Sequence, residues 1–355
     1  MRVSIARWGA TIDRILIIRS SAIGDVIFAS PLIGALRRKY PQAHIAWLAE
    51  PPVEDLLRRH PQLDEVLVWD KAGWKRLWRA RRYRTLWRAF RAFVGQLRRS
   101  RFDTAIDAQG LLKSGIWAWL SGARRRIGLG SREGSARLMT EVVDKPRDSD
   151  LIGSEYRQLA NHLGLQTEPF PMHVGLWPED EVCVEALRQQ HRLDDGYAVI
   201  CPFTTRPQKH WFADHWIELI GRLRHDFGLP VVMLGGPADK PAAAGIAAYA
   251  EVIDLTGRTR IPEAAAVIRH CRLLVGVDTG LTHLGTAFER PTVCLFGSTS
   301  PYLRTDSPLT RVIWHGLACS PCRRKPTCGG AFTCMREITP TEVVQQCKAL
   351  LESAS

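Results

Sequence analysis

The chain of 355 residues has no apolar run long enough to cross a membrane. A membrane-spanning helix needs roughly 18 or more consecutive apolar residues, whereas the hydrophobic residues here, 45% of the total, fall in shorter runs. The residues before Asp13 also contain no apolar segment of signal-peptide length. We therefore expect a protein that has no membrane-spanning helix and stays in the cytosol.

A Gly-x-Gly-x-x-Gly motif is also missing after the first strand-like segment, Ile15–Ile18. In dinucleotide-binding oxidoreductases this motif lets the backbone approach a pyrophosphate closely. Its absence argues against a nucleotide-dependent oxidoreductase.

Acidic residues are absent from the segment between Lys71 and Arg101, which contains 12 lysines and arginines in a chain of net charge +13. A helix face that is merely solvated usually mixes the two signs. The pattern indicates a surface for anionic lipid headgroups, an acidic substrate or nucleic acid. Tryptophans and phenylalanines are interleaved with these charges: Trp74, Trp78, Trp87, Phe90 and Phe93.

Short apolar runs alternate with longer amphipathic segments along most of the chain. This alternation predicts βαβ units and parallel sheets. The expected strands are Ile15–Ile18, Ile45–Leu48, Val66–Trp69 and Thr104–Asp107 in the first half, and Tyr197–Phe203, Pro230–Leu234, Val252–Leu255, Leu273–Val277, Thr292–Phe296 and Arg311–Trp314 in the second.

Three prolines, Pro169, Pro171 and Pro178, separate the two series of strands. Such a segment is typical of a link between domains. We therefore expect an α/β protein with two Rossmann-like, doubly wound domains, residues 1–170 and 171–338, and a ligand cleft between them. A C-terminal helix, Thr341–Glu352, follows within residues 339–355.

The first motif with a chemical interpretation, Ser20-Ser21-x-x-Gly24-Asp25, follows the first strand. Gly24 permits close approach of another backbone or a ligand. Asp25 places a carboxylate at the start of a helix, where aspartate usually serves as a cap. A catalytic role is the alternative.

A second motif carries two hydroxyls, Thr204 and Thr205, followed by Lys209 at the start of the next helix. Neutral donors beside one cation suit a diphosphate. An ordinary turn with a surface lysine is the alternative interpretation.

In the third motif, the strand Leu273–Val277 leads directly into Asp278-Thr279-Gly280. A helix that starts at the carboxyl edge of a parallel sheet offers free backbone N–H groups to a phosphate. We expect Asp278 to cap this helix and Thr279 and Gly280 to donate to an oxyanion. His283 lies one turn further on the same face, as a phosphate contact or as a structural histidine.

Together, four ordered motifs resemble the lipopolysaccharide heptosyltransferases of glycosyltransferase family 9, and within them the heptosyltransferase I branch. The motifs, which fall between about residues 14 and 300, are Ser20-Ser21-x-x-Gly24-Asp25, Asp107-Ala108-Gln109-Gly110-x-x-Lys113-Ser114, Thr204-Thr205-Arg206-x-x-Lys209-His210-Trp211 and Asp278-Thr279-Gly280-x-x-His283.

This resemblance implies a GT-B fold and an inverting transfer of L-glycero-D-manno-heptose from ADP-heptose to Kdo of Kdo-lipid A, without a divalent metal. It also implies that the first domain binds the acceptor, that the second binds the nucleotide sugar, and that the C-terminal helix packs back on the first domain. The enzyme would work at the cytoplasmic face of the inner membrane as a peripheral protein.

The resemblance also gives roles to individual residues. Asp25 would be the general base that takes the acceptor proton, and Asp278 would orient its loop or bind the heptose. An inverting displacement needs a base on the acceptor side and positive potential on the leaving-group side, so these groups are expected from opposite domains. The donor contacts would be Thr204, Thr205, Lys209, Thr279, Gly280 and His283 for the diphosphate, Asp239 for the ribose and Thr259 near the adenine.

The basic segment gains a role from the same resemblance, because Kdo carboxylates and lipid A phosphates are anionic. The expected acceptor contacts are Arg76, Arg79, Arg82 and Lys113, and an anionic membrane surface is an expected partner. A nucleic-acid-binding protein is the alternative from another class, and it predicts salt-sensitive binding of oligonucleotides. The four motifs favour the transferase, so no nucleic acid partner is expected.

Four of the nine cysteines, Cys319, Cys322, Cys328 and Cys334, form a compact set that departs from the heptosyltransferase I pattern. Cytosolic sets of this kind favour zinc or iron over disulfides, but the spacing after the first pair is shorter than in common zinc ribbons. Unligated thiols are the first expectation and a structural zinc or iron site is the second. The departure leaves a heptosylated core or a protein as alternative acceptors.

Overall fold

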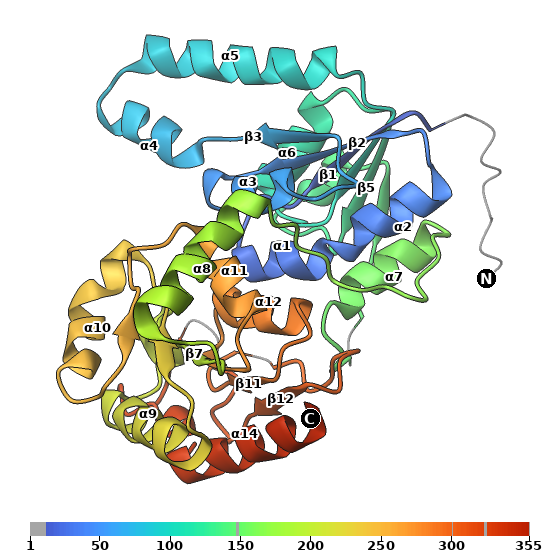
Figure 1. Cartoon of the computed structure of the whole chain (residues 1–355). Coiled ribbons are helices and arrows are strands. Elements are labelled where there is room, and N and C mark those ends of the chain that lie inside the picture. Colours follow the sequence, from blue (N-terminus) through green and yellow to red (C-terminus); the bar gives the residue numbers. More distant parts are fainter. Residues whose placement is uncertain (1–11, 147–148, 300, 323–324, 355) are drawn as a thin grey trace. The chain divides into compact units, whose positions relative to one another are not determined.

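The computed structural model describes residues 12–146, 149–299, 301–322 and 325–354 (Figure 1). These residues divide into two compact units. The first takes in the described parts of Met1–Ser21, Ala29–Arg147 and Glu155–Phe170, and the second those of Ala22–Phe28, Asp148–Ser154 and Pro171–Ser355. The short segment Ala22–Phe28 therefore belongs to the second unit, although only three residues separate it from the first strand of the first unit.

Among the described residues, six parallel strands form the centre of the first unit, in the order β3-β2-β1-β4-β5-β6. Nearly every residue of β1, β2 and β4 is buried, as expected for parallel strands covered on both faces. The strands are β1 (Arg14–Ile18), β2 (His44–Ala49), β3 (Glu65–Val68), β4 (Thr104–Asp107), β5 (Arg125–Leu129) and β6 (Glu141–Val143).

The helices of this unit follow the strands in the alternation that the sequence predicts. Proline stands in the first turn of both α2 and α3, where its missing N–H has no partner to lose. The helices are α2 (Pro31–Lys39), α3 (Pro51–Arg58), α4 (Lys71–Arg79), α5 (Tyr83–Arg99), α6 (Leu112–Leu120), the 3-10 helix η1 (Ser135–Leu138) and α7 (Ser154–His162).

The second unit repeats this arrangement in the part of the chain that the structure covers. Six parallel strands lie in the order β12-β11-β10-β7-β8-β9. Numbered from its own first strand, each sheet has the order 3-2-1-4-5-6 of a dinucleotide-binding fold. The strands are β7 (Ala198–Cys201), β8 (Val231–Met233), β9 (Ile253–Asp254), β10 (Leu273–Val277), β11 (Thr292–Leu295) and β12 (Thr310–Ile313).

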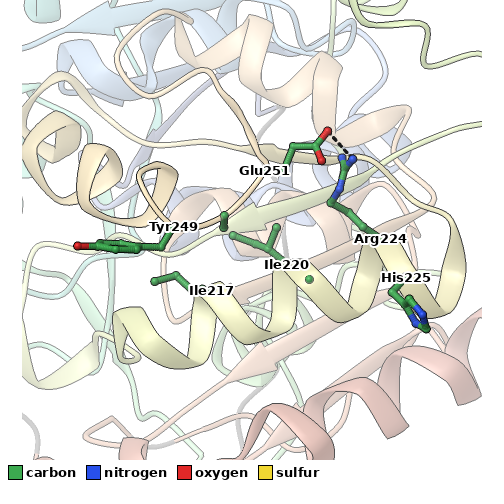
Figure 2. A pocket seen from close by; sticks show the side chains of 8 residues that line it. Ile217, Ile220, Arg224, His225, Tyr249 and Glu251 are labelled. Carbon is green, nitrogen blue, oxygen red and sulfur yellow. Dashed lines mark ion pairs between the residues drawn. The ribbon is translucent and has the colours of Figure 1, made fainter.

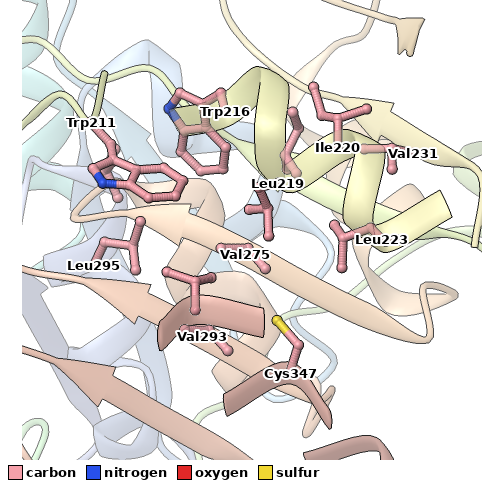
Figure 3. Packing of buried hydrophobic residues seen from close by; sticks show 14 of the residues in the cluster. Trp211, Trp216, Leu219, Ile220, Leu223, Val231, Val275, Val293, Leu295 and Cys347 are labelled. Atoms are coloured by element: carbon pink, nitrogen blue, oxygen red, sulfur yellow. The ribbon is translucent and has the colours of Figure 1, made fainter. Parts of the chain in front are cut away.

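A core of large side chains stabilises the second unit (Figure 3). Trp211 and Trp216 pack edge to face with ring centroids 4.9 Å apart, and the Trp211 indole donates to the backbone oxygen of Ile338. Val343 and Cys347 of the C-terminal helix belong to this cluster. That helix was expected to pack back on the first domain, but it forms part of the core of the second unit.

The helices of the second unit are α1 (Ile23–Ala29), α8 (Pro178–His191), α9 (Ala213–Phe227), α10 (Lys240–Ala247), α11 (Ile261–Arg269), α12 (Gly280–Ala287), α13 (Thr333–Arg336) and α14 (Pro340–Ala354), with the 3-10 helices η2 (Pro207–Lys209) and η3 (Pro237–Asp239).

All ten expected strands form, and each end lies within two residues of the predicted one. The predicted α/β architecture of two doubly wound sheets is therefore confirmed. The expectation that Asp25 and Lys209 come from opposite domains is not met, because α1, which carries Asp25, groups with the second unit.

Candidate active site

The strand order of the second sheet reverses between β7 and β10, which lie side by side. Loops that leave the carboxyl ends of two such strands diverge to opposite faces and leave room for a ligand. The loop after β7 carries Thr204 and Lys209, and the loop after β10 carries Asp278. Two of the predicted motifs therefore meet at this switch point.

Asp278 is the centre of the resulting cluster. Its Oδ2 lies 2.5 Å from Nζ of Lys209 and accepts a hydrogen bond of 2.6 Å from the hydroxyl of Thr299. Its Oδ1 lies 3.3 Å from Nε2 of His283. The prediction that Asp278 caps α12 is wrong. The N-cap residue is Thr279, whose side chain makes no cap hydrogen bond, and the carboxylate of Asp278 contacts Lys209, Thr299 and His283 instead.

The charges of the cluster favour an ionised Asp278. Burial alone would raise the pKa of this carboxyl, but the hydrogen bond and charge of His283, together with the ammonium of Lys209, hold it well below its usual range. An ammonium has three N–H donors, so Lys209 keeps two donors when one is bound to Asp278. The cluster thus presents a fixed cation at the edge of the sheet.

His283 is buried, and both of its ring nitrogens have partners. Opposite the Asp278 contact, Nδ1 lies 3.1 Å from the hydroxyl of Tyr302, which in turn lies 3.3 Å from Sγ of Cys294. The ring also packs against Phe28 of α1, with centroids 4.6 Å apart. These contacts fix the orientation of the imidazole.

Two glycines bring the starts of α1 and α12 together. A Cβ atom on Gly24 would lie 2.6 Å from Cδ2 of His283, and one on Gly280 would lie 2.7 Å from Cβ of Ile23. Real Cβ atoms do not approach other atoms this closely, so any larger residue at either position would push the helices apart. Glycine is therefore required here for packing.

Asp25, the next residue along α1, is half-buried. Its Oδ2 accepts a hydrogen bond of 3.2 Å from the backbone N–H of Ala22. The carboxylate thus serves the start of its own helix, as an N-terminal aspartate usually does. Its position beside Gly24 also places it one residue from the contact with His283.

The remaining predicted donor contacts follow strands of the same sheet. Thr204 donates to the backbone oxygen of Asp278 at 3.4 Å, and Thr205 is exposed beside it. Asp239 ends η3, after β8, and accepts from the backbone N–H of Gly236. Thr259 lies in the loop after β9. The loops after β8 and β9 are joined by a bond of 2.9 Å from the N–H of Gly257 to the oxygen of Gly235.

The first unit has a second polar group at its own switch point, between β1 and β4. The N–H and the hydroxyl of Ser20 lie 3.1 and 3.0 Å from Oε1 of Gln109. Glu50, just after β2, lies 3.7 Å from Nζ of Lys71 and 3.8 Å from Nζ of Lys113. Burial and the neighbouring Lys71 lower the pKa of Lys113.

Arg76, Arg79 and Arg82, the other predicted acceptor contacts, lie on or next to α4 and at the start of α5. All three are exposed to solvent. They stand on other elements than Lys113, which lies on α6 beside Glu50.

The four clustered cysteines do not form a metal site in the residues that the structure describes, where no three His, Cys, Asp or Glu side chains are placed to hold an ion. Cys319 is exposed, whereas Cys334 is buried. Burial, followed by the charges of the Cys319, Cys322 and Cys328 thiolates, raises the pKa of Cys334.

Three residues of the two polar groups were not predicted from the sequence, and a fourth, Gln109, was part of the Asp107–Ser114 motif but was given no role. Glu50 and Gln109 follow β2 and β4, and Thr299 and Tyr302 follow β11. Each lies past the carboxyl end of a parallel strand, which is the signal that could have found them. This position alone did not single the residues out, because single polar residues in loops are common.

A shallow hollow of about 390 Å³ opens elsewhere on the second unit (Figure 2). Ile217 and Ile220 of α9 form its floor, and Arg224 pairs with Glu251 at 2.5 Å on its rim. It contains none of the predicted site residues, so we assign it no part in the chemistry. In the described ranges, no helix is long and apolar enough to pass through a bilayer.

Comparison with known proteins gives one family. The sequence model of glycosyltransferase family 9 (heptosyltransferase) matches residues 90–331. Lipopolysaccharide heptosyltransferase 1 of Pseudomonas aeruginosa is 29% identical over 95% of this chain and 98% of its own length. Lipopolysaccharide heptosyltransferase 2 of Escherichia coli is 28% identical over 95% of this chain and 98% of its own length.

Among solved structures, the ADP-heptose lipopolysaccharide heptosyltransferase II of E. coli is similar, with a TM-score of 0.71, 25% identity, and coverage of 96% of this chain and 99% of that one. This similarity, together with the two six-stranded parallel sheets among the described residues, confirms the predicted GT-B type of fold.

Proposed function

Because the chain belongs to glycosyltransferase family 9 and is therefore a glycosyltransferase, we propose that it transfers L-glycero-D-manno-heptose, with inversion, from ADP-heptose to Kdo of Kdo-lipid A. Relatives named lipopolysaccharide heptosyltransferase 1 support heptose as the transferred sugar and lipopolysaccharide as the class of acceptor. The observation that carries the proposal is the cluster of Asp278, Lys209 and His283 at the switch point of the second sheet.

The cluster suits a departing nucleoside diphosphate. Lys209 would donate to the diphosphate with the N–H groups that Asp278 leaves free, and the start of α12 at Thr279 and Gly280 adds the positive end of a helix dipole. Further contacts would come from Thr204, Thr205 and His283, with Asp239 at the ribose and Thr259 near the adenine.

In the proposed reaction, the acceptor hydroxyl oxygen attacks the anomeric carbon of the heptose, and the bond from that carbon to the phosphate oxygen breaks. ADP leaves with the bonding electron pair. Asp25 takes the proton of the hydroxyl. Lys209 and the helix terminus stabilise the charge that develops on ADP, which is the task of a divalent ion in other transferases. We therefore propose that catalysis needs no metal.

The acceptor side is proposed for the first unit. Lys113, with Arg76, Arg79 and Arg82, would bind the carboxylates and phosphates of the acceptor. In this proposal, residues 1–170 bind the acceptor, residues 171–338 bind the nucleotide sugar, and residues 339–355 support the second of these. The protein would act as a peripheral enzyme at the cytoplasmic face of the inner membrane.

The four clustered cysteines are proposed to be thiols that take no part in catalysis. A structural zinc or iron site would show as about one equivalent of metal per chain in the purified protein, measured by inductively coupled plasma mass spectrometry. Activity that survives prolonged chelation would show separately that the reaction itself needs no metal.

The experiment that tests the function measures ADP release from ADP-heptose in the presence of Kdo-lipid A. Replacing a general base lowers kcat by about 10² to 10⁴-fold, so the kcat of Asp25→Asn should be lower than that of the unchanged protein by this factor. The matched control is Asp226→Asn, because Asp226 is a surface carboxylate on α9 paired with Arg222. Absence of ADP release, or full activity of Asp25→Asn, contradicts the proposal or the role of Asp25.

A heptosylated core is the second candidate acceptor, favoured by the similarity to heptosyltransferase 2 of E. coli over 95% of the chain. The two acceptors are separated by assaying Kdo-lipid A and its monoheptosylated product side by side. A kcat/KM at least tenfold higher on the monoheptosylated acceptor would assign the chain to the second transfer.

A further inference from the structure

Helices α4 and α5 form a hairpin whose tip is exposed (Figure 1). Every residue from Arg79 to Thr85 is exposed to solvent. Three large aromatic side chains near the tip are also exposed: Trp78 by 62%, Tyr83 by 51% and Trp87 by 58%. Burying a tryptophan is strongly favourable in water, so three exposed aromatics on one short hairpin indicate a surface that binds something.

The hairpin has charge of one sign. No acidic residue occurs between Lys71 and Arg101. In the part of the chain covered by the structure, none of the basic side chains from Lys75 to Arg91 forms an ion pair. Unpaired cations repel one another and raise the energy of the free protein, so their positive potential is available to an anionic partner.

The exposed aromatics are not part of an incompletely packed core. The inner face of the hairpin is well packed: Trp74 and Phe93 both meet the buried Trp117 of α6, with ring centroids 5.9 and 5.0 Å apart. Trp78 instead packs edge to face on Tyr83 at the tip, 5.3 Å away. Trp87 stacks on Phe90 of the inner face, with ring centroids 5.5 Å apart. The exposed rings therefore extend outward from a well-packed inner set.

The turn between α4 and α5 contains an arginine, Arg81, in a backbone conformation that is unfavourable for a residue with a side chain. Arg81 has a φ of 54°, a region in which glycine is favoured over every residue with a side chain. Arg81 is exposed, so its side chain makes no packing contribution that would offset this strain. The residue therefore adds to the potential of the tip at the expense of backbone stability.

The neighbouring helix α6 adds an exposed apolar stripe. Leu112, Ile116 and Trp119 are spaced four and three residues apart, lie on one face of the helix and are all exposed. The opposite side of α6 is buried in the first unit. A helix that is apolar on both its inner and outer faces is typical of burial or of contact with a membrane.

We propose that the first unit docks on an anionic lipid bilayer through the outer surface of the α4–α5 hairpin and the exposed stripe of α6. The arginines would contact headgroup phosphates, and the tryptophans and Tyr83 would enter the interfacial layer, where such rings are favoured. The aliphatic side chains of α6 favour a bilayer over nucleic acid, since Leu112 and Ile116 offer nothing to a base or a phosphate.

This inference rests on the proposed function only in that a lipid-linked acceptor lies in such a bilayer. Binding is therefore measured without donor or acceptor, using the full chain and vesicles of phosphatidylglycerol and phosphatidylcholine against vesicles of phosphatidylcholine alone. We expect sedimentation with the anionic vesicles that weakens as salt rises. Equal binding to both kinds of vesicle overturns the proposal.

Variants of the hairpin locate the surface. Arg81→Gly, Arg84→Gln and Arg88→Gln should each lower the vesicle partition constant about fivefold, because each arginine near an anionic surface contributes about that factor. Arg81→Gly should not lower the melting temperature, since glycine relieves the strained φ. Tyr83→Ser should weaken binding even at high salt, where the electrostatic part is screened.

Matched controls come from the second unit. Tyr249→Ser removes an aromatic side chain that is 79% exposed, and Lys348→Gln removes an exposed cation from α14. Both should bind vesicles as the unchanged protein does. Hairpin variants that bind as well as these controls overturn the proposal, as does an oligonucleotide that binds more tightly than the vesicles and displaces them.

Different results would contradict the proposed heptose transfer and the proposed membrane docking. In detergent micelles, the arginine variants should transfer heptose to Kdo-lipid A at the unchanged rate, whereas in anionic vesicles they should lose activity in step with binding. A protein that binds vesicles but transfers no heptose under either condition contradicts the proposed function alone. A protein that is equally active in both, with no vesicle binding, contradicts the docking alone.

Discussion

The imidazole of His283 occupies the space in which a side chain on Gly24 would begin, with a Cβ at Gly24 only 2.6 Å from Cδ2 of the ring. The same ring lies 3.3 Å from Asp278, which in turn binds Lys209. The start of α1 is therefore packed directly on the proposed leaving-group site. Asp25, one residue further along α1, is held in place by this contact.

Replacing Gly24 with alanine should disturb both stability and donor binding. The added methyl group would force the helices apart at a cost of about 1–3 kcal/mol, and it would move His283 away from Asp278. We expect a lower free energy of unfolding and a raised KM for ADP-heptose. Chemical denaturation and ADP-release kinetics measure the two effects.

The control for that variant is Gly221→Ala, on the exposed side of α9. A Cβ at Gly221 meets no atom within 4 Å, so alanine there should raise helix stability by about 0.5–1 kcal/mol and leave the KM unchanged. Equal behaviour of the two variants would show that the contact between Gly24 and His283 has no structural importance.

Removing the cation at the switch point should weaken nucleotide binding. A hydrogen bond to a charged group contributes about 1.5–3 kcal/mol, so Lys209→Met should raise the Kd for ADP about tenfold to 100-fold. Isothermal titration calorimetry measures this, with Lys348→Met on α14 as the control. An unchanged Kd for Lys209→Met would remove Lys209 from the diphosphate site.

The pKa of Asp278 makes part of the stability pH-dependent. Because its pKa in the folded protein lies well below the unfolded value of about 4, its ionised form stabilises the fold fully above that unfolded value. This contribution is lost as pH falls toward the folded pKa. The stability difference between the unchanged protein and Asp278→Asn should therefore be full at pH 5 and about 1 kcal/mol smaller at pH 3.

Urea unfolding at the two pH values tests this prediction. A difference for Asp278→Asn that grows as the pH falls would contradict the assigned direction of the pKa shift.

The cysteines should differ sharply in reactivity. Backbone N–H groups, first that of Phe332, hold the pKa of Cys328 below its usual value, whereas burial raises the pKa of Cys271, Cys294 and Cys347 to about 12. The thiolate is the reactive form. Iodoacetamide at neutral pH should therefore label Cys328 early and leave the three buried thiols unlabelled, as peptide mass spectrometry can follow.

Unfolding in guanidinium is the control, since all nine cysteines should then react. Labelling of Cys294 in the native protein at the rate of Cys328 would contradict the buried environment next to Tyr302. Protection of Cys319 and Cys328 that is lost on chelation would instead reveal a bound metal at the four-cysteine set.

The sequence predicted ten of the twelve strands in the described residues, because parallel strands buried on both faces appear as unbroken apolar runs, of which Leu273–Val277 is the clearest. Two strands were not predicted. Strand β5 starts with two half-buried arginines, Arg125 and Arg126, and β6 has three residues, so neither shows a long apolar run.

The site was predictable only in part, for a related reason. Thr204, Lys209 and Asp278 follow apolar strands in recognisable order, and the structure brings them together. The partners Thr299 and Tyr302 stand alone in a loop, so only the folded chain shows what they contact. The capping role assigned to Asp278 was wrong because local sequence does not show that Lys209, 69 residues away, competes for its carboxylate.

The assignment of Ala22–Phe28 to the second unit limits how the protein can be taken apart. A cut at the proline-rich link would leave α1 on one fragment and His283, its packing partner, on the other. A chimera that exchanges donor specificity between relatives would therefore need to transplant this seven-residue segment together with the C-terminal half. The second unit, which such a chimera would exchange as a whole, is discontinuous in sequence.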